Sequence, residues 1–332
     1  MIRQAVSRWL GDPRLARLAR PLLRRRATVF MLHRFAHPDR GPGLRGLECL
    51  LETLRRERVP IVGLSTLLDR WETDPRGLAG AVAFTVDDGY ADFDTLGGPL
   101  FARFDAPVTV FLVTGFLDRQ LWLWWDQVSW IAETTRNDLM VPIEHEPSLR
   151  IGGTTGGERR AAAAAVVERL KDLPDLGRRD AIGALAREAG VEIPAASPEQ
   201  YAPMTWDQAR SWSSRGVTFG PHTMSHPVLS RADPETSARE IRGSWERLRA
   251  EIPGAVPVFC YPNGRAADFG SREEQTVADL GLRAALATTT GYLGPGAARF
   301  ALPRFALPSS LGGAVQIAFG VERAKALWRG TR

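Results

Sequence analysis

The sequence has only two cysteines, Cys49 and Cys260, among its 332 residues. Two cysteines cannot build a disulfide framework, and these two lack the spacing of a thiolate metal site. The chain also has no run of about 18 apolar residues, and its beginning contains no uninterrupted apolar core of signal-peptide length. We therefore expect no transmembrane helix and no cleaved signal, and we expect a cytoplasmic protein.

The part of the chain after residue 26 has no excess of basic residues. The formal net charge is +5, but residues 1–26 carry eight arginines and one aspartate, so the rest of the chain is slightly acidic. Two interpretations of the basic segment stay open: it lies on an anionic membrane surface at the inner face, or it is a solvated helix packed on the domain. We expect no nucleic-acid partner, because aromatic residues are not interleaved along this segment as a base-stacking groove needs.

The composition is that of an ordinary soluble globular protein, with 44% hydrophobic and 24% charged residues. Short runs rich in Val, Ala, Phe and Ile are separated by helix-like segments, which is the pattern of βα units around a parallel sheet. Seven or eight such units over this length favour a barrel over an open sheet. The predicted strands are 28–33, 60–63, 81–86, 107–113, 216–220, 256–261, 283–288 and 300–306.

Helical patterns lie between several of these runs. The predicted helices are 94–104, 234–251 and 272–280, with Asp233-Pro234 and Ser271 as plausible starts. The regular spacing breaks between about 118 and 205, where tryptophans, a glycine-rich stretch and an alanine-rich helical sequence intervene. We interpret 118–205 as an insertion over one face of the barrel. The predicted organisation is a basic segment, 1–27, followed by one barrel domain, 28–332.

Polar and reactive residues stand at the ends of four predicted strands. In a barrel of this kind the carboxyl ends of the strands surround a common mouth, which is where such folds carry function. The residues are His33 after "TVFML", Asp87 and Asp88 after "AVAFTV", His222 and His226 after "VTFGP", and Tyr261 and Asn263 in "VFCYPNG".

His222 and His226 lie four residues apart and can meet at one ion, although Pro227 disfavours a helix there and favours a turn or loop. Two imidazoles and one carboxylate make a catalytic divalent site with open positions for water and substrate. One of the adjacent aspartates can bind the ion while the other faces the water as a general base. Taken alone, the histidine pair is also compatible with surface or core histidines, and "DDG" with a turn that caps a strand.

The segments "FTVDDGYADF", "FGPHTMSHPVLS" and "VFCYPNG", in this order, resemble the metal-dependent polysaccharide deacetylases of carbohydrate esterase family 4. The resemblance extends from about residue 28 to 306. It implies a distorted (β/α)7 barrel with a helical, Trp-rich insertion. The implied activity is hydrolytic removal of N-acetyl groups from an amino-sugar-containing saccharide, such as an exopolysaccharide or a cell-envelope precursor.

The resemblance also implies roles for individual residues. Asp88, His222 and His226 would hold a divalent metal, usually Zn²⁺, and Asp87 would take a proton from the water that attacks the acetamide. The turn containing Tyr261 and Asn263 would contact the substrate and supply a backbone N–H for the oxyanion.

This sequence departs from the commonest family pattern at two positions. No histidine follows His226 to act as the acid, and the position of a base-orienting arginine is Cys260. "VFMLHRF" is similar to a motif that some exopolysaccharide deacetylases carry near the amino terminus, so we assign the role of general acid to His33. The alternative is that Asp87 acts both as the base and, once protonated, as the acid. Arg304 in "ALPRFALP" would supply the missing cation, or form a structural salt bridge.

Tryptophans are concentrated in "LWLWWDQVSW", residues 121–130. Sugar faces stack well on indole rings, so Trp124 and Trp125 are candidate substrate contacts, and Asp126 is a candidate partner for sugar hydroxyls. The alternatives are buried packing within the insertion and a seat for lipid.

Three functions stay open on the sequence. The first is saccharide deacetylation, which we favour. The second is hydrolysis of a small amide by an amidohydrolase, but the Trp-rich insertion favours a sugar as the substrate. The third is a non-catalytic saccharide-binding protein on the same fold. The complete ligand trio beside Asp87 argues against it, whereas the missing arginine leaves room for it.

Overall fold

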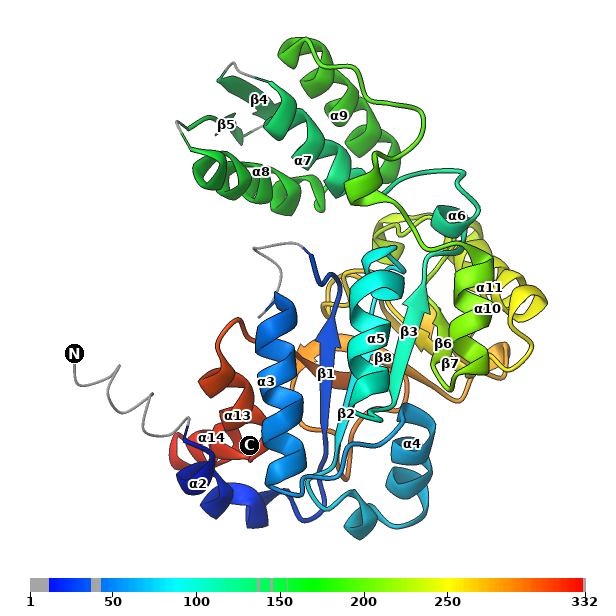
Figure 1. Ribbon diagram of the computed structural model, residues 1–332. Helices are drawn as coiled ribbons and strands as arrows, with labels where there is room; N and C mark the ends of the chain where they lie inside the picture. The colour runs from blue at the N-terminus through cyan, green and yellow to red at the C-terminus, as the bar shows by residue number, and fades with distance from the viewer. Residues whose placement is uncertain (1–11, 37–42, 136–137, 144–145, 154, 331–332) are drawn as a thin grey trace.

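Seven parallel strands curl into a nearly closed barrel in the computed structural model, which describes residues 12–36, 43–135, 138–143, 146–153 and 155–330 (Figure 1). The strand order is β6-β3-β2-β1-β9-β8-β7, and every pairing in it is parallel. The strands are β1 Thr28–Leu32, β2 Val82–Val86, β3 Val108–Leu112, β6 Thr218–Pro221, β7 Val258–Cys260, β8 Ala284–Thr290 and β9 Leu302–Ala306.

The barrel is distorted where its two ends meet. β6 and β7 are the outer strands of the sheet order, and the N–H of Val256, just before β7, donates to the carbonyl of Phe219 in β6 at 2.8 Å. The register between β8 and β9 also shifts between Leu286 and Thr290. These features confirm the predicted distorted seven-stranded barrel.

Helices cover the barrel on the outside. Asp233 begins the longest of them, because its side chain accepts a hydrogen bond from the N–H of Thr236. The outer helices are α3 Gly43–Arg56, α4 Leu64–Thr73, α5 Gly98–Arg103, α6 Thr114–Leu117, α10 Trp206–Ser214, α11 Pro234–Glu251, α12 Ser271–Asp279, α13 Leu311–Ala318 and α14 Val321–Trp328. Short helical turns are η2 Pro75–Leu78, η3 Phe93–Gly97 and η5 Leu229–Arg231.

Seven of the eight predicted strands are present, and the strand predicted at 60–63 is wrong. Ile61 makes only an isolated bridge to Val82, and α4 begins at Leu64 directly afterwards. The helices predicted at 234–251 and 272–280 are confirmed, and the one predicted at 94–104 divides into η3 and α5.

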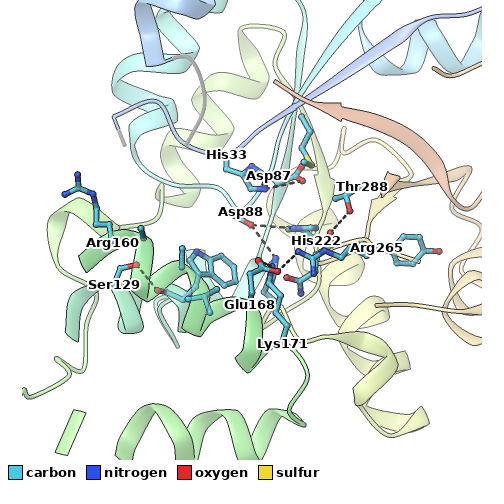
Figure 2. A pocket seen from close by; sticks show the side chains of 18 of the residues that line it. His33, Asp87, Asp88, Ser129, Arg160, Glu168, Lys171, His222, Arg265 and Thr288 are labelled. Atoms are coloured by element: carbon cyan, nitrogen blue, oxygen red, sulfur yellow. Dashed lines mark hydrogen bonds and ion pairs between the residues drawn. The ribbon is translucent and has the colours of Figure 1, made fainter. Parts of the chain in front are cut away.

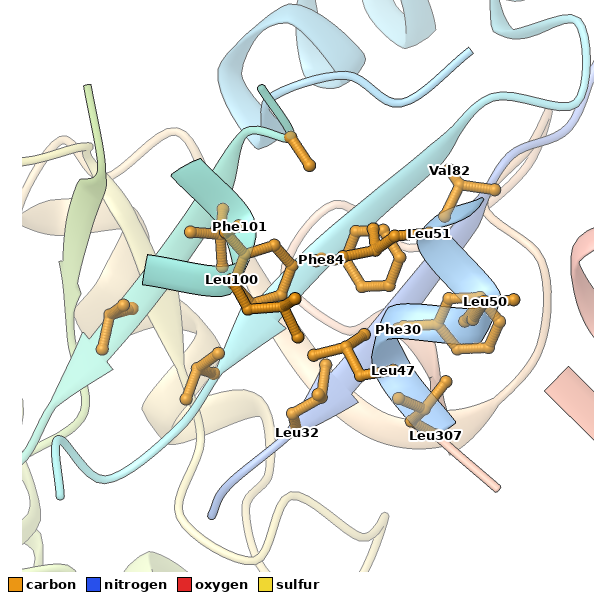
Figure 3. Packing of buried hydrophobic residues seen from close by; sticks show 14 of the residues in the cluster. Phe30, Leu32, Leu47, Leu50, Leu51, Val82, Phe84, Leu100, Phe101 and Leu307 are labelled. Carbon is orange, nitrogen blue, oxygen red and sulfur yellow. The ribbon is translucent and has the colours of Figure 1, made fainter. Parts of the chain in front are cut away.

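Side chains alternate between the inside and the outside of the barrel along each strand. Phe30 and Phe84 point outward and pack under α3 and α5, with their rings 5.7 Å apart (Figure 3). The neighbouring residues in sequence point the other way. They include Val29, Ala83 and Phe111, which belong to the cluster inside the barrel. The same alternation continues past the strand ends and decides which polar residues face the mouth.

The segment between β3 and β6 stands over the carboxyl ends of the strands (Figure 1). It has a hydrophobic cluster of its own, which includes Trp122, Leu123 and Val128. Its elements are α7 Trp124–Thr134, β4 Leu139–Ile143, β5 Glu146–Ile151, α8 Gly156–Leu170, α9 Asp175–Ala189 and η4 Glu199–Tyr201. The division of the chain into a basic segment, a barrel and an insertion stays a prediction.

The described part of the basic segment forms α2, Pro13–Ala16, and η1, Arg17–Leu23, while residues 1–11 lie outside the described residues. Both elements pack beside α13 and α14 at the end of the chain (Figure 1). Among the residues that the structure describes, no helix has the length and apolar character that crossing a membrane requires.

We predict that Phe84→Ala lowers the free energy of unfolding by about 3–5 kcal/mol, because it leaves a cavity in the outer core. The ring of Phe84 is buried against Phe30 and Phe101, the latter at 5.4 Å between centroids. Urea unfolding followed by circular dichroism measures the change, with Leu176→Ala as the control because Leu176 is 72% exposed. Equal stability of the two variants would contradict this account of the core.

Candidate active site

Asp87 and Asp88 point in different directions because the backbone turns sharply between them. Asp87 continues the inward-facing set of β2, after Ala83 and Thr85. Asp88 has a left-handed backbone with φ +77°, and Gly89 follows with φ +91°. A Cβ on Gly89 would lie 2.7 Å from Cδ2 of Leu112, so the turn needs glycine there. Because of this turn, the carboxylates of Asp87 and Asp88 both lie at the mouth of the barrel but point in different directions.

Asp88, His222 and His226 come together at the mouth of the barrel. Each histidine Nε2 lies 3.6 Å from Oδ1 of Asp88, and ligand atoms of the three residues lie within 4.8 Å of one another. All three side chains are buried, and neither carboxylate oxygen of Asp88 has a hydrogen-bond partner. A buried carboxylate without partners is costly unless a cation compensates it. The three donors therefore fit a divalent metal.

The surroundings of the histidines aim them at Asp88. The Nδ1–H of His222 donates to the carbonyl of Cys260 at 2.7 Å, which leaves Nε2 as the acceptor atom that faces Asp88. His226 lies in a loop, as Pro227 predicts, with a left-handed backbone of φ +57°. Thr223 also has a left-handed backbone, and its hydroxyl accepts from the N–H of His226 at 3.0 Å.

Two further residues support the histidine loop from outside. Glu240 of α11 accepts hydrogen bonds from the N–H groups of Met224 and Ser225, both at 2.8 Å. The ring of Trp125 lies 4.4 Å from that of His226. Burial lowers the pKa of His226 to about 3. His226 is therefore neutral at physiological pH, which is the form that binds metals.

Arg304 holds Asp87 in a bidentate ion pair inside the barrel. Its Nη1 donates to Oδ1 at 2.8 Å and its Nη2 to Oδ2 at 2.9 Å. Nη1 also donates to the hydroxyl of Thr85, and Nε donates to the carbonyl of Ala287. Burial raises the pKa of the Asp87 carboxyl, but the charge of Arg304 outweighs it together with the other nearby groups, so the pKa lies below its ordinary value. Asp87 is thus held ionised and oriented.

His33 is the most accessible of these polar groups. Its Nε2 lies 4.0 Å from Oδ2 of Asp87, and its side chain is 35% exposed. It follows β1, so the end of that strand brings it to the same side of the pocket as Asp87 (Figure 2).

The turn after β7 places Tyr261 and Asn263 differently from what the sequence suggests. Both residues contribute to the pocket wall. The ring of Tyr261, however, stacks on Phe269 at 3.8 Å in a buried apolar cluster, and its N–H donates to the carbonyl of Leu286. Asn263 keeps a buried side-chain amide nitrogen without a hydrogen-bond partner. The buried hydroxyl of Tyr261 also has no hydrogen-bond partner, so each of the two residues keeps one unused donor.

The structure brings only one of the three candidate residues of α7 to the pocket. Trp125 lines it, whereas Trp124 packs under Arg178, whose guanidinium lies 4.7 Å from the ring. Asp126 is buried and accepts a hydrogen bond from the hydroxyl of Tyr90 at 2.6 Å. Trp124 and Asp126 therefore contribute to packing, which corrects the expectation that they meet the sugar. The indole N–H of Trp125 donates to the Tyr90 hydroxyl, so this buried network also holds the tryptophan.

The barrel and the insertion line a pocket of about 690 Å³ beside Asp88, His222 and His226 (Figure 2). Helix α8 lines the far side, and Glu168 from it accepts hydrogen bonds from Lys171 at 2.7 Å and from Arg265 of the barrel at 2.5 Å. Sequence reasoning missed three charged residues of the pocket wall, because a solvated helix face and a pocket wall have the same charge pattern. They are Arg160 and Glu168 on α8 and Lys171 directly after it. Sequence reasoning also missed Glu240, for which the sequence carries no signal.

The comparisons with known proteins agree with this arrangement. Residues 181–285 match the family described as Polysaccharide deacetylase. No curated protein matches the chain. Solved structures with the same fold include the Streptococcus pyogenes deacetylase PplD in complex with acetate, at 16% identity, TM-score 0.57, 88% of this chain and 98% of that chain. IcaB from Ammonifex degensii is similar at 15% identity, TM-score 0.56, 89% of this chain and 97% of that chain.

The deacetylase domain of BpsB from Bordetella bronchiseptica is also similar, at 16% identity, TM-score 0.51, 85% of this chain and 96% of that chain. Identities at this level show the shared fold, and the segment matched by the family includes His222 and His226 of the candidate metal site. Residues 181–285 thus match the Polysaccharide deacetylase family, and the seven-stranded barrel is the fold of the solved deacetylases.

Proposed function

We propose that this protein removes N-acetyl groups from an amino-sugar-containing saccharide and that it depends on a divalent metal. The observation that carries the proposal is the pair of buried Asp88 oxygens without partners, with His222 and His226 beside them. Asp88, His222 and His226 would hold the ion, and Zn²⁺ suits a site with two imidazoles and one carboxylate. When bound, the metal would supply Lewis acidity toward a water molecule and toward the acetamide carbonyl.

Asp87 is the proposed general base. It is ionised, it faces the pocket, and Arg304 fixes both of its oxygens. A positioned carboxylate of this kind can accept the proton of the attacking water, and the fixed orientation removes the cost of reorganising it during the reaction. Arg304 supports this role as a positioning residue, because it contacts Asp87 and does not line the pocket.

His33 is the proposed general acid. It lines the pocket within 4.0 Å of Asp87, and its partial exposure suits a group that must regain a proton in each cycle. It would protonate the departing amine, while the amide nitrogen of Asn263 would donate to the oxygen that develops negative charge. The alternative is that Asp87, once protonated, returns its own proton to the amine.

The pocket supports a saccharide over a small amide. Its volume of about 690 Å³ lies in the range of sites for larger ligands, and its wall combines the Trp125 ring with polar groups such as Ser129 and Asn263. The match to the family described as Polysaccharide deacetylase favours a polysaccharide as the substrate class, such as an exopolysaccharide or a cell-envelope precursor. A non-catalytic saccharide-binding protein is disfavoured, since an ionised, oriented Asp87 stands beside the ligand trio.

Elemental analysis tests the metal site without knowledge of the substrate. The purified chain, reconstituted with Zn²⁺, should hold about one ion, and His222→Ala combined with His226→Ala should hold none. His33→Ala is the matched control, because His33 lies outside the trio and its loss should leave the metal content unchanged. A reconstituted wild type without metal would refute the proposed function and favour saccharide binding without catalysis.

Arg304→Met should move the acid limb of the kcat/KM profile to higher pH. The charge of Arg304 lowers the pKa of Asp87 against the effect of burial, so removal of the cation leaves burial to raise that pKa. A smaller fraction of the base is then ionised in acid. Acetate release from an acetylated oligosaccharide, measured across pH, checks the shift, and Arg304→Lys should remain closer to the wild type because it keeps the charge. An unshifted limb in the methionine variant would argue against Asp87 as the base.

His33→Gln should lower kcat by about 10²–10⁴, which is the usual contribution of a general acid or base. The substitution removes the titrating group and keeps a polar side chain of similar size. Metal content serves as the control and should equal that of the wild type. A variant with wild-type turnover would return the acid role to Asp87.

A further inference from the structure

The two ends of the described chain form an exposed apolar surface. We define this terminal surface by Leu18 and Leu22 of η1 and by Leu327 and Trp328 at the end of α14. Among the described residues, seven large hydrophobic side chains are exposed, and these are four of them. Leu18 is 75% exposed and Trp328 is 89% exposed. Such a concentration on two elements that pack on each other is unlike the scattered apolar residues of an ordinary surface.

Arginines surround the terminal surface. The exposed ones in the described part of the chain are Arg14, Arg17, Arg24 and Arg25 near the start and Arg329 near the end. Acidic residues are few here among the described residues: Asp12 caps α2, α2 and η1 themselves contain none, and Glu322, in the first turn of α14, pairs with Lys325 at 2.6 Å. Within the described part of the chain, the terminal surface therefore combines apolar side chains with an excess of positive charge.

The terminal surface lies at the end of the barrel opposite the pocket. Leu23, the last residue of η1, packs against Gly320 at the start of α14, and β1 begins only five residues later at Thr28. Both elements are thus near the amino end of β1, whereas His33 follows its carboxyl end. In Figure 1 the insertion stands above the barrel, and α2 and α14 lie at its lower left.

We propose that the terminal surface docks on the surface of an anionic lipid bilayer. Exposed leucine and tryptophan beside arginine is the composition of segments that lie in the membrane interface, where the apolar side chains enter the headgroup region and the cations meet lipid phosphates. The indole of Trp328 suits this boundary, because such rings prefer the headgroup level. The excess of one charge sign favours an anionic surface over a second copy of the same positively charged face.

This docking would determine how the enzyme faces its substrate. Because the pocket opens at the other end of the barrel, it would face the aqueous phase while the chain is bound. The metal ligands and the insertion would stay clear of the lipid. The inference stands on the terminal surface alone and does not depend on the proposed deacetylation.

Vesicle sedimentation with the full chain tests the proposal. The chain should bind vesicles in which about one-third of the phosphatidylcholine is replaced by phosphatidylglycerol, and it should bind pure phosphatidylcholine at least tenfold more weakly. Arg14→Gln, Arg17→Gln and Arg24→Gln together should weaken binding to the anionic vesicles at least tenfold. The matched control replaces Arg187, Arg239 and Arg242, which are exposed on α9 and α11, and should bind like the wild type.

A second variant separates apolar insertion from simple charge attraction. Leu18→Ser with Trp328→Ser should bind at least fivefold more weakly at constant charge, whereas Leu176→Ser, which removes an equally exposed leucine from α9, should not. Folding of each variant is checked by circular dichroism. The proposal would be overturned by equal binding to neutral and anionic vesicles, by no binding at all, or by equal loss in the control variants. The proposal would also be overturned if light scattering gave the mass of a self-associated form in which the terminal surface is covered.

Discussion

The ion pair between Asp87 and Arg304 is the interaction on which the geometry of the site depends. Both charges are buried inside the barrel, and each would be costly there without the other. Arg304 comes from β9 and Asp87 follows β2, so the pair spans β1, which lies between these strands in the sheet. Thr85, the carbonyl of Ala287 and the sulfur of Cys260 accept further hydrogen bonds of the guanidinium. The pair thus fixes the position of Asp87, while the next residue, Asp88, points toward the two histidines.

Short-range spacing made part of this site predictable from the sequence. The adjacent aspartates and the histidine pair are each separated by only a few residues, and each follows an apolar run that reads as a strand. Parallel strands bring their carboxyl ends to one edge, so these residues meet without detailed knowledge of the packing. The family match at residues 181–285 begins after the aspartates, and it therefore supports the histidine half of the site independently of the "DDG" turn.

Other parts of the site depend on packing that local sequence does not encode. Neighbouring residues of a helix point about 100° apart, so Trp124, Trp125 and Asp126 cannot all face one pocket, and tertiary contacts decide which one does. Here Arg178 covers Trp124, and Tyr90 binds Asp126. The strand predicted at 60–63 failed for a related reason. Its residues are apolar enough for a strand, but the bridge at Ile61 is followed at once by α4.

Closure of the barrel explains how residues at the two ends of the chain can complete one site. His33 follows β1 and Arg304 lies in β9, and these two strands pair in parallel through Phe30 with Phe305 and Met31 with Ala306. Groups 271 positions apart in sequence therefore reach the same carboxylate, with His33 4.0 Å from Oδ2 and Arg304 in contact with both oxygens. In a barrel the order of the strands around the axis, and not their order along the chain, determines which side chains meet. An orienting cation can therefore come from β9 while Cys260 occupies the end of β7, since both side chains lie next to Asp87.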